Sequence, residues 1–212
     1  MRSAMIVDVL VVGPLQCNCV ILGDVASKTA IVVDPGDEVD RIVEALARHE
    51  MRAVAIVATH AHIDHVGGIA ELKARTGAPA LLHHADVPLY EALAEQAEWL
   101  GVAPPAVAKL DGTLDVTTEL AVGTSPVTVL HTPGHSPGSV CFRIADQRLV
   151  LSGDTLFAGS IGRTDLWGGS FEQIIASIRS QLLALPDETN VIPGHGPATT
   201  IGQERRSNPF LT

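Results

Sequence analysis

Three histidines and an aspartate fall within six residues, directly after an apolar stretch at 53–58. His60 and His62 are two residues apart, so in an extended segment their side chains project from the same side and can bind one ion. Asp64 and His65 follow where the chain turns into a predicted helix, so they point elsewhere and could hold a second ion. A buried strand that delivers polar side chains into a loop is a rigid way to present a metal ion. The segment predicts a metal site rather than a solvated, histidine-rich turn.

Three further segments end an apolar stretch with a candidate ligand beside a glycine. These candidates are His135, Asp154 and His195. Glycine permits tight turns and close backbone approach at the edge of a sheet. Four strand-end loops that converge on one place predict a catalytic cleft. The sequence has no Cys-x-x-Cys pair, which agrees with this interpretation because structural zinc usually takes thiolates.

Together these motifs resemble a known family. The set HxHxDH, TPGH, SGDT and PGHG is similar to that of the metallo-β-lactamase-fold hydrolases. The stretch GDTLFAGSIGRTD and the ending ERRSNPFL are most similar to the glyoxalase II-like branch, and the resemblance covers essentially the whole chain. It implies a first metal bound by His60, His62 and His135, a second bound by Asp64, His65 and His195, and Asp154 bridging both.

The implied ligands suggest hydrolytic chemistry. Five histidines and two carboxylates without a thiolate suit two zinc ions and tolerate iron or manganese. Two ions bridged by Asp154 and a solvent molecule would lower the pKa of that solvent towards neutrality. We expect the resulting hydroxide to attack a carbonyl carbon while one ion stabilises the oxyanion and the other accepts the leaving group. Asp64 could orient the hydroxide, so Asp64 and Asp154 are the candidate catalytic residues.

The resemblance implies a thioester substrate of the S-2-hydroxyacylglutathione type, or a thioester of another small thiol. Arg163 matches a basic position that the family uses for the thiol portion, although an ordinary loop cation is an alternative. Asp165 stands where an aromatic residue is usual in the family, which weakens the case for glutathione. The chain stops soon after Pro197, so we expect a short form without the C-terminal helical domain that binds glutathione in full-length glyoxalase II.

A second reaction class fits the same motifs. Persulfide dioxygenases resemble this pattern, including GRTD, but use one iron held by the equivalents of His60, His135 and Asp154. The ligands alone leave both classes open, because all seven residues can be present in either. The loop at 193–197 favours the hydrolases. A lactonase, a β-lactamase and a non-enzymatic metal-binding module are weaker alternatives.

The elements that would position these residues alternate between strands and helices. We expect strands at 5–12, 17–22, 30–33, 53–58, 80–83, 119–122, 127–131, 139–144 and 148–151, and helices from Asp37 or Glu38, at 66–76, at 86–100 and from Ser170. Gln173 would complete a capping box with Ser170. The last helix would bury Phe171, Ile174, Ile175, Ile178, Leu182 and Leu185. This order predicts an α/β fold of two mixed sheets packed back to back and flanked by helices, the four-layer αββα sandwich of the metallo-β-lactamase fold.

Composition narrows the class of protein. A length of 212 residues without a low-complexity linker suits a single domain, 1–212. The net charge of −10 argues against nucleic acid as a partner, and no apolar run is long enough to span a membrane. Three cysteines offer no disulfide framework, so we expect a reducing cytoplasm. A small-molecule substrate is the expected partner, and the sequence gives no indication of the oligomeric state.

The remaining polar candidates are assigned simpler roles. Asp34, at the end of a predicted strand, could hold a metal ligand in place or form a turn. His131 is expected to orient the loop that carries His135. His83 and His84 lack ligand spacing to the main cluster, so only a place at the rim can be suggested for them. His49 is expected at the surface, and Cys17 and Cys141 are expected to pack as small apolar side chains.

Overall fold

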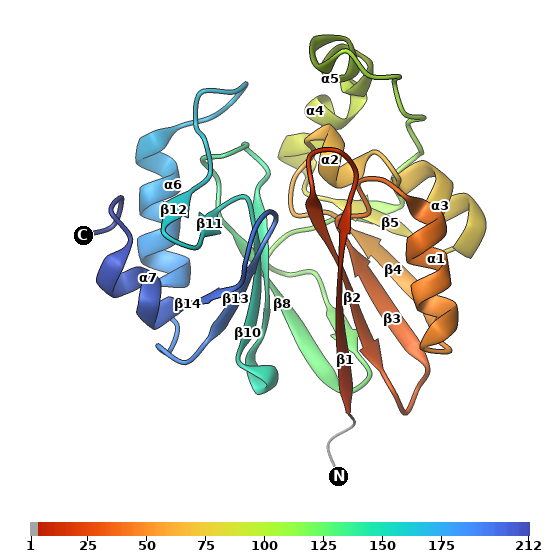
Figure 1. Cartoon of the computed structure of the whole chain (residues 1–212), viewed down its shortest axis with the longest axis horizontal. Helices are drawn as coiled ribbons and strands as arrows, with labels where there is room; N and C mark the ends of the chain where they lie inside the picture. Colours follow the sequence, from red (N-terminus) through yellow and green to blue (C-terminus); the bar gives the residue numbers. More distant parts are fainter. Residues whose placement is uncertain (1–3) are drawn as a thin grey trace.

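The first half of the chain builds one six-stranded sheet in the computed structural model, which describes residues 4–212 (Figure 1). The strand order is β1 (Met5–Val12), β2 (Cys17–Asp24), β3 (Thr29–Val33), β4 (Arg52–Val57), β5 (Ala80–Leu82) and β6 (Gly112–Thr113). Strands β1 to β3 pair antiparallel, whereas β3 to β6 run parallel. The parallel pairs need crossovers, and helices α1 (Val39–Arg48) and α3 (Ile69–Thr76) lie within them.

The second half builds another six-stranded mixed sheet. Its order is β14 (Thr199–Thr200), β13 (Asn190–Pro193), β10 (Leu149–Gly153), β9 (Val140–Ile144), β8 (Ser125–His131) and β7 (Leu120–Val122). Only β10 and β13 pair in parallel. Their crossover contains a small hairpin, β11 (Leu156–Phe157) with β12 (Ser160–Ile161), and helix α6 (Phe171–Ser177), which continues into a π-turn at Ile178–Leu182. Helix α7 (Ile201–Ser207) closes the chain.

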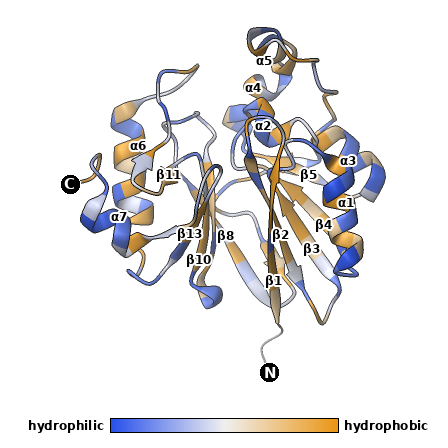
Figure 2. Cartoon of the chain, in the orientation of Figure 1, coloured by the Kyte–Doolittle hydropathy of each residue, from blue (hydrophilic) through white to orange (hydrophobic). Residues whose placement is uncertain are grey.

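Alternating strand side chains divide the core into three apolar layers. In β3, Ile31 and Val33 face the other sheet, whereas Ala30 and Val32 face the helices. The central layer joins both sheets, and Phe142 is among its fully buried side chains. The outer layers pack α1 and α3 on one side, and α6 and α7 on the other (Figure 1). Figure 2 shows the corresponding pattern, with apolar strands inside and helices that are hydrophilic outside. The predicted four-layer αββα sandwich is confirmed.

Each strand that the sequence predicted is present, to within a few residues at its ends, whereas the short strands β6, β11, β12 and β14 and helix α7 have no predicted counterpart. Two predicted helices differ from those in the structure. The helix expected at 66–76 is split into α2 (Ile63–Val66) and α3 by Gly67 and Gly68. The loop after β3 crosses here: the backbone N–H of Gly68 donates to the Pro35 carbonyl at 2.9 Å. A Cβ at Gly67 would lie 2.7 Å from the Gly36 carbonyl oxygen, so the approach requires glycine.

The prediction of a single helix at 86–100 is also wrong. The structure has a 3-10 turn at His84–Asp86, then α4 (Val87–Glu91) and α5 (Leu93–Leu100). Pro88 falls in the first turn of α4, where its missing N–H is tolerated, and Ala92 separates the two helices. Phe171 is a further correction: it is the first residue of α6 and is 53% exposed, while Ile174 and Ile178 are fully buried. The expected capping bond is present, from the Gln173 N–H to Ser170 Oγ.

No helix within residues 4–212 is long and apolar enough to cross a membrane.

Candidate metal centre

The structure brings all seven predicted ligands together at one end of the two sheets. The first sheet contributes the loop after β4 and the short helix α2, and the second sheet contributes the loops after β8, β10 and β13. Each loop follows a strand that buries at least alternate side chains, so the backbone that carries the ligands is anchored in the core. The seven residues are His60, His62, Asp64, His65, His135, Asp154 and His195.

Three imidazoles form what we call the three-histidine group: His60, His62 and His135. His60 Nε2 lies 3.0 Å from His62 Nδ1 and 3.2 Å from His135 Nε2, and His62 Nδ1 lies 2.9 Å from His135 Nε2. His60 is fully buried and His135 is 2% exposed. Three converging nitrogens at these separations can bind one ion.

The other set, the aspartate group, contains Asp64, His65 and His195. His195 Nε2 lies 3.1 Å from Asp64 Oδ2 and 3.2 Å from His65 Nε2. This group is more open than the three-histidine group, because the His195 side chain is 27% exposed and that of Asp64 is 18% exposed. It can bind a second ion on the side of the centre that faces solvent.

Asp154 lies between the two groups. Its Oδ2 is 3.6 Å from His135 Nε2 and 3.7 Å from His195 Nε2, and its Oδ1 is 3.5 Å from His65 Nε2. That Oδ1 atom is buried and has no hydrogen-bond partner within residues 4–212. Buried polar atoms almost always have a partner, so a cation between the ligands fits this site. The cluster is typical of a dimetal centre.

Hydrogen bonds on the far side of the rings fix which nitrogen faces the centre. The Nδ1–H of His135 donates to the Arg163 carbonyl at 2.8 Å, and that of His195 donates to the Gln16 carbonyl at 3.2 Å. A carbonyl can only accept, so each Nδ1 carries a proton and each Nε2 faces the other predicted ligands, where an ion could replace any proton on Nε2. These bonds therefore hold both rings with Nε2 directed towards the centre.

Asp34 orients one predicted ligand of each group: His65 directly, and His60 through the Thr59 hydroxyl. Its Oδ2 accepts from His65 Nδ1 at 3.0 Å and from Thr59 Oγ1 at 2.8 Å. Because the Thr59 hydroxyl donates to Asp34, it accepts from His60 Nδ1 at 3.1 Å. Asp34 is only 2% exposed and has a left-handed backbone, φ 52°. The sequence left two roles open for Asp34, and the structure places it against a predicted ligand.

Electrostatics differ between the groups. Burial holds the pKa of His60 well below its usual value and, with the charge of His135, lowers that of His62 to about 3, so both rings stay neutral. In the aspartate group, burial opposes ionisation of Asp64, but the charges of His65 and His195 outweigh it and lower the pKa of Asp64. Asp64 is consequently a carboxylate at neutral pH.

Gly194 makes room for the Asp154 carboxylate. A Cβ at this position would lie 2.2 Å from Asp154 Oδ1 and 2.7 Å from His65 Cε1. Any side chain at this position would displace both groups, so the observed arrangement requires glycine at 194.

Asp86 is a site residue that sequence reasoning missed. It is fully buried, and its carboxylate accepts from the Ala61 N–H at 3.0 Å, the Ser136 hydroxyl at 2.7 Å and the Gly138 N–H at 2.6 Å. These bonds join the loop that carries His60 and His62 to the loop that carries His135. In the sequence, an aspartate two residues before a proline is typical of a helix start, so local pattern gives no signal of this role.

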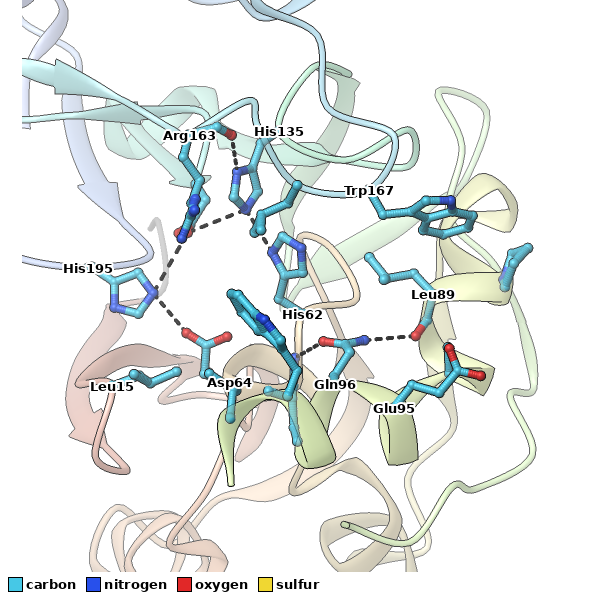
Figure 3. A pocket seen from close by; sticks show the side chains of 17 residues that line it. Leu15, His62, Asp64, Leu89, Glu95, Gln96, His135, Arg163, Trp167 and His195 are labelled. Carbon is cyan, nitrogen blue, oxygen red and sulfur yellow. Dashed lines mark hydrogen bonds and ion pairs between the residues drawn. The ribbon is translucent and has the colours of Figure 1, made fainter. Parts of the chain in front are cut away.

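A pocket of about 770 Å³ opens above the centre (Figure 3). Polar members of its lining include His62, Asp64, Asp154 and His195, and Arg163 lies at its edge. The Arg163 guanidinium pairs with both carboxylate oxygens of Asp165, at 2.7 and 2.8 Å. Arg163 thus lies in the pocket, as its predicted role requires, but its charge is partly compensated.

The other histidines lie outside the pocket lining. His131 donates from Nε2 to the Pro137 carbonyl at 3.0 Å, a contact that suits the predicted orienting role, and stacks on His83. His84 contacts His83. His49 lies near the surface beside Asp8 at 2.8 Å. The thiols of Cys17 and Cys141 are buried, as predicted, and burial raises the pKa of each to about 11.

Two named proteins match almost the whole chain. A protein of Haemophilus influenzae named hydroxyacylglutathione hydrolase GloC is 37% identical over 97% of each chain. A protein of Bacillus subtilis named probable metallo-hydrolase YqgX is 38% identical over 94% of each chain. The chain is therefore similar to proteins named as hydrolases over at least 94% of its length.

Solved structures agree in fold and sequence. BLEG-1, a B3 metallo-β-lactamase, has a TM-score of 0.90 and 40% identity and covers 98% of this chain and 100% of its own. TTHA1623, solved in a di-iron-bound form, has a TM-score of 0.87 and 40% identity, covering 96% and 100%. ETHE1 from Myxococcus xanthus has a TM-score of 0.81 and 28% identity, covering 97% and 84%.

The family profile described as the metallo-beta-lactamase superfamily matches residues 12–195, which span every predicted ligand. The profile, the two relatives and the ligand cluster lead to one conclusion: the chain belongs to the metallo-β-lactamase superfamily and is a metal-dependent hydrolase of that superfamily.

Proposed function

We propose that the protein is a dinuclear zinc hydrolase that cleaves a thioester of the S-2-hydroxyacylglutathione type. The observation that carries the proposal is the buried Asp154 Oδ1, which has no hydrogen-bond partner within residues 4–212 and lies between the two ligand groups at the floor of a pocket. The relative named hydroxyacylglutathione hydrolase supports the choice of substrate. Because the ligands contain no thiolate, zinc suits them, and the di-iron form of TTHA1623 supports iron as the alternative.

The bound ions would supply a water of lowered pKa and would polarise the thioester carbonyl. The chain itself provides the remaining functions. Asp64 is ionised at neutral pH and lies at the solvent side of the centre, so it can accept a hydrogen bond from the attacking water and orient it. No serine or cysteine nucleophile is needed, and the thiol of Cys17, with its pKa raised by burial, would be a poor one.

Arg163 would bind the thiol portion of the substrate. It lies in the pocket lining, and its backbone carbonyl accepts from His135. The same residue would therefore contact the substrate through its side chain and orient the His135 ring through its backbone. Its bidentate pair with Asp165 competes with any substrate carboxylate for the same guanidinium. We therefore expect weak binding of the glutathione portion, seen as a high KM rather than a low kcat.

The persulfide dioxygenase remains the second candidate, because its three ligands are contained in the larger cluster. His60 Nε2 and His135 Nε2 are 3.2 Å apart, and Asp154 Oδ2 lies 3.6 Å from His135. That reaction needs one iron and leaves the aspartate group without a role. The equally tight contacts of Asp64, His65 and His195 favour the hydrolase.

The test is steady-state kinetics on S-lactoylglutathione with zinc-loaded protein, run beside oxygen uptake on glutathione persulfide with iron-loaded protein. The proposal predicts thioester turnover without oxygen uptake. Oxygen consumption by a form with one iron, and no thioester cleavage, would instead assign the dioxygenase. A β-lactam and a lactone in the same panel test the weaker alternatives.

A further inference from the structure

We infer that the pocket selects a thioester whose acyl group ends in an apolar tail, and that this tail binds a surface we call the tryptophan wall. The wall comprises Leu89 of α4, Trp99 of α5, and Leu166 and Trp167 of the loop before α6. This inference rests on the proposed thioester hydrolysis and adds the chemical class of the acyl group.

The wall exposes large apolar side chains beside the reacting centre. Trp99 is 69% exposed and Trp167 is 59% exposed, although both are large apolar residues. The chain has only two tryptophans, and both line this pocket. Exposed apolar side chains that cluster in a concave site mark a binding surface.

Polar groups near the wall are already engaged. The Gln96 side chain accepts from the Ile63 N–H at 2.9 Å, and it donates to the carbonyls of Leu89 at 2.8 Å and Ala61 at 3.1 Å. Its amide therefore has little left to offer a ligand. Glu95 adds a negative charge to the same lining. A tail that is apolar and uncharged fits this side of the pocket better than an anionic one.

The two ends of a thioester would then lie on opposite sides of the centre. In Figure 3, Trp167 and Leu89 lie on one side of His62, whereas Arg163 and His195 lie on the other. A carbonyl held between the two ligand groups would direct its acyl tail towards the wall and its thiol portion towards Arg163. Selectivity for the tail and for the thiol would therefore depend on different residues.

The kinetic test varies only the tail. S-lactoyl-, S-2-hydroxybutanoyl- and S-2-hydroxyhexanoylglutathione share the thiol and the 2-hydroxyl and differ in methylene groups alone. Because each methylene packed in an apolar site improves kcat/KM, we expect a rise of about tenfold from the lactoyl to the hydroxyhexanoyl thioester. A flat or falling series with active enzyme would overturn the inference and leave the proposed hydrolysis intact.

Substitution of the two tryptophans tests whether the dependence of kcat/KM on acyl chain length arises from the tryptophan wall. Trp99→Ala and Trp167→Ala should each reduce the ratio of kcat/KM between the longest and shortest thioester to about threefold or less. Phe210→Ala is the matched control, because Phe210 is a 45% exposed aromatic residue outside the pocket lining, and it should keep the full ratio. An unchanged ratio in both tryptophan variants would show that the tail binds elsewhere.

A binding measurement separates this inference from the proposed function. Since both tryptophans line the pocket, their fluorescence reports its occupancy by the non-hydrolysable thioethers S-hexylglutathione and S-methylglutathione. We expect the hexyl compound to bind about tenfold more tightly. That result without any thioester turnover would refute the hydrolysis while supporting the apolar site. Equal affinities would refute the apolar site, whatever the turnover.

Discussion

Within residues 4–212 the histidines form two clusters that differ in geometry, and His60, His62, His65, His135 and His195 have the geometry of a metal centre. In the centre, His60 and His135 meet edge to face at 80°, so their inner nitrogens converge to 3.2 Å. In the second cluster, His83 and His131 stack nearly parallel, at 12° with ring centroids 4.3 Å apart. Stacked rings direct their nitrogens outward in their own planes, so proximity alone does not make a ligand set.

Surrounding acceptors account for the difference. In the centre, carbonyls and Asp34 accept from the outer nitrogens, which directs the inner nitrogens towards Asp64 and Asp154. In the stacked cluster, His131 instead directs its Nε2–H to the Pro137 carbonyl. Carboxylates beside converging nitrogens therefore distinguish a centre that can bind ions from a cluster that orients a loop.

The largest expected effect comes from the bridging carboxylate. Asp154→Asn keeps the shape of the side chain but removes the charge that both ligand groups share. We expect a loss of at least about a thousandfold in kcat/KM, and reduced occupancy at both sites, because several kcal/mol of charge stabilisation disappear. Elemental analysis beside kinetics checks this, with the exposed Asp111→Asn as control. Two retained ions and near-normal turnover would contradict the bridging role.

A smaller effect is expected at Asp34, which contacts one ligand of each group. Asp34→Asn should lower metal affinity by about ten- to a hundredfold, because an amide cannot accept from His65 and Thr59 as a carboxylate does. Competition with a chromogenic chelator measures this affinity. His131→Gln is the comparison from the other cluster and should leave metal affinity unchanged. An equal loss of metal affinity in both variants would contradict the conclusion that only the first cluster supports metal binding.

The stacked cluster of His83 and His131 should instead affect how the free energy of unfolding changes at acidic pH. Burial, with the charges of His131 and His84, lowers the pKa of His83 to about 4, against the attraction of Asp115. The unfolded value is about 6.5, so the unfolded chain binds this proton more tightly. The associated stability is fully present above about pH 6.5 and is lost as the pH falls towards about 4.

His83→Gln should therefore flatten the decline in unfolding free energy over that range, by about 1 kcal/mol after allowance for solvent screening. Urea unfolding of metal-free protein at several pH values measures the slope. The metal content of the same variant should equal that of the wild type. A steeper slope than the wild type's would contradict the lowered pKa of His83, and loss of metal would tie this residue to the metal centre.

The smallest effect concerns a carboxylate that pairs with an arginine rather than with the metal ligands. Asp165→Asn should release the Arg163 guanidinium and lower KM for S-lactoylglutathione by about threefold with little change in kcat, since exposed ion pairs are weak. Arg163→Ala should raise KM instead. If Asp165→Asn lowered kcat and left KM unchanged, Arg163 would not be the thiol contact.

The sequence predicts the layers, and the structure brings the predicted ligands together, because both depend on local pattern. His60 and His62 follow an apolar strand at a spacing of two, and alternation in the strands specifies which face is buried. Long-range contacts set the rest. Gly67 and Gly68 interrupt a helix because another loop crosses there.

Asp86 shows the same limit at the site. Its partners Ala61, Ser136 and Gly138 are distant in the chain, so its role in joining two ligand loops exists only in the folded molecule. The tryptophan wall is similar, because Trp99 and Trp167 come from separate segments and share one pocket only after folding. Local pattern cannot reveal either feature.

The central claim is a centre of two ions that share Asp154, and zinc titration of metal-free protein tests it most directly. Binding followed by calorimetry, with thioester turnover measured at each addition, should saturate at two equivalents, and turnover should rise mainly with the second. Asp154→Asn should abolish the two-equivalent end point. Saturation at a single equivalent with full thioester turnover would contradict a shared, two-ion centre.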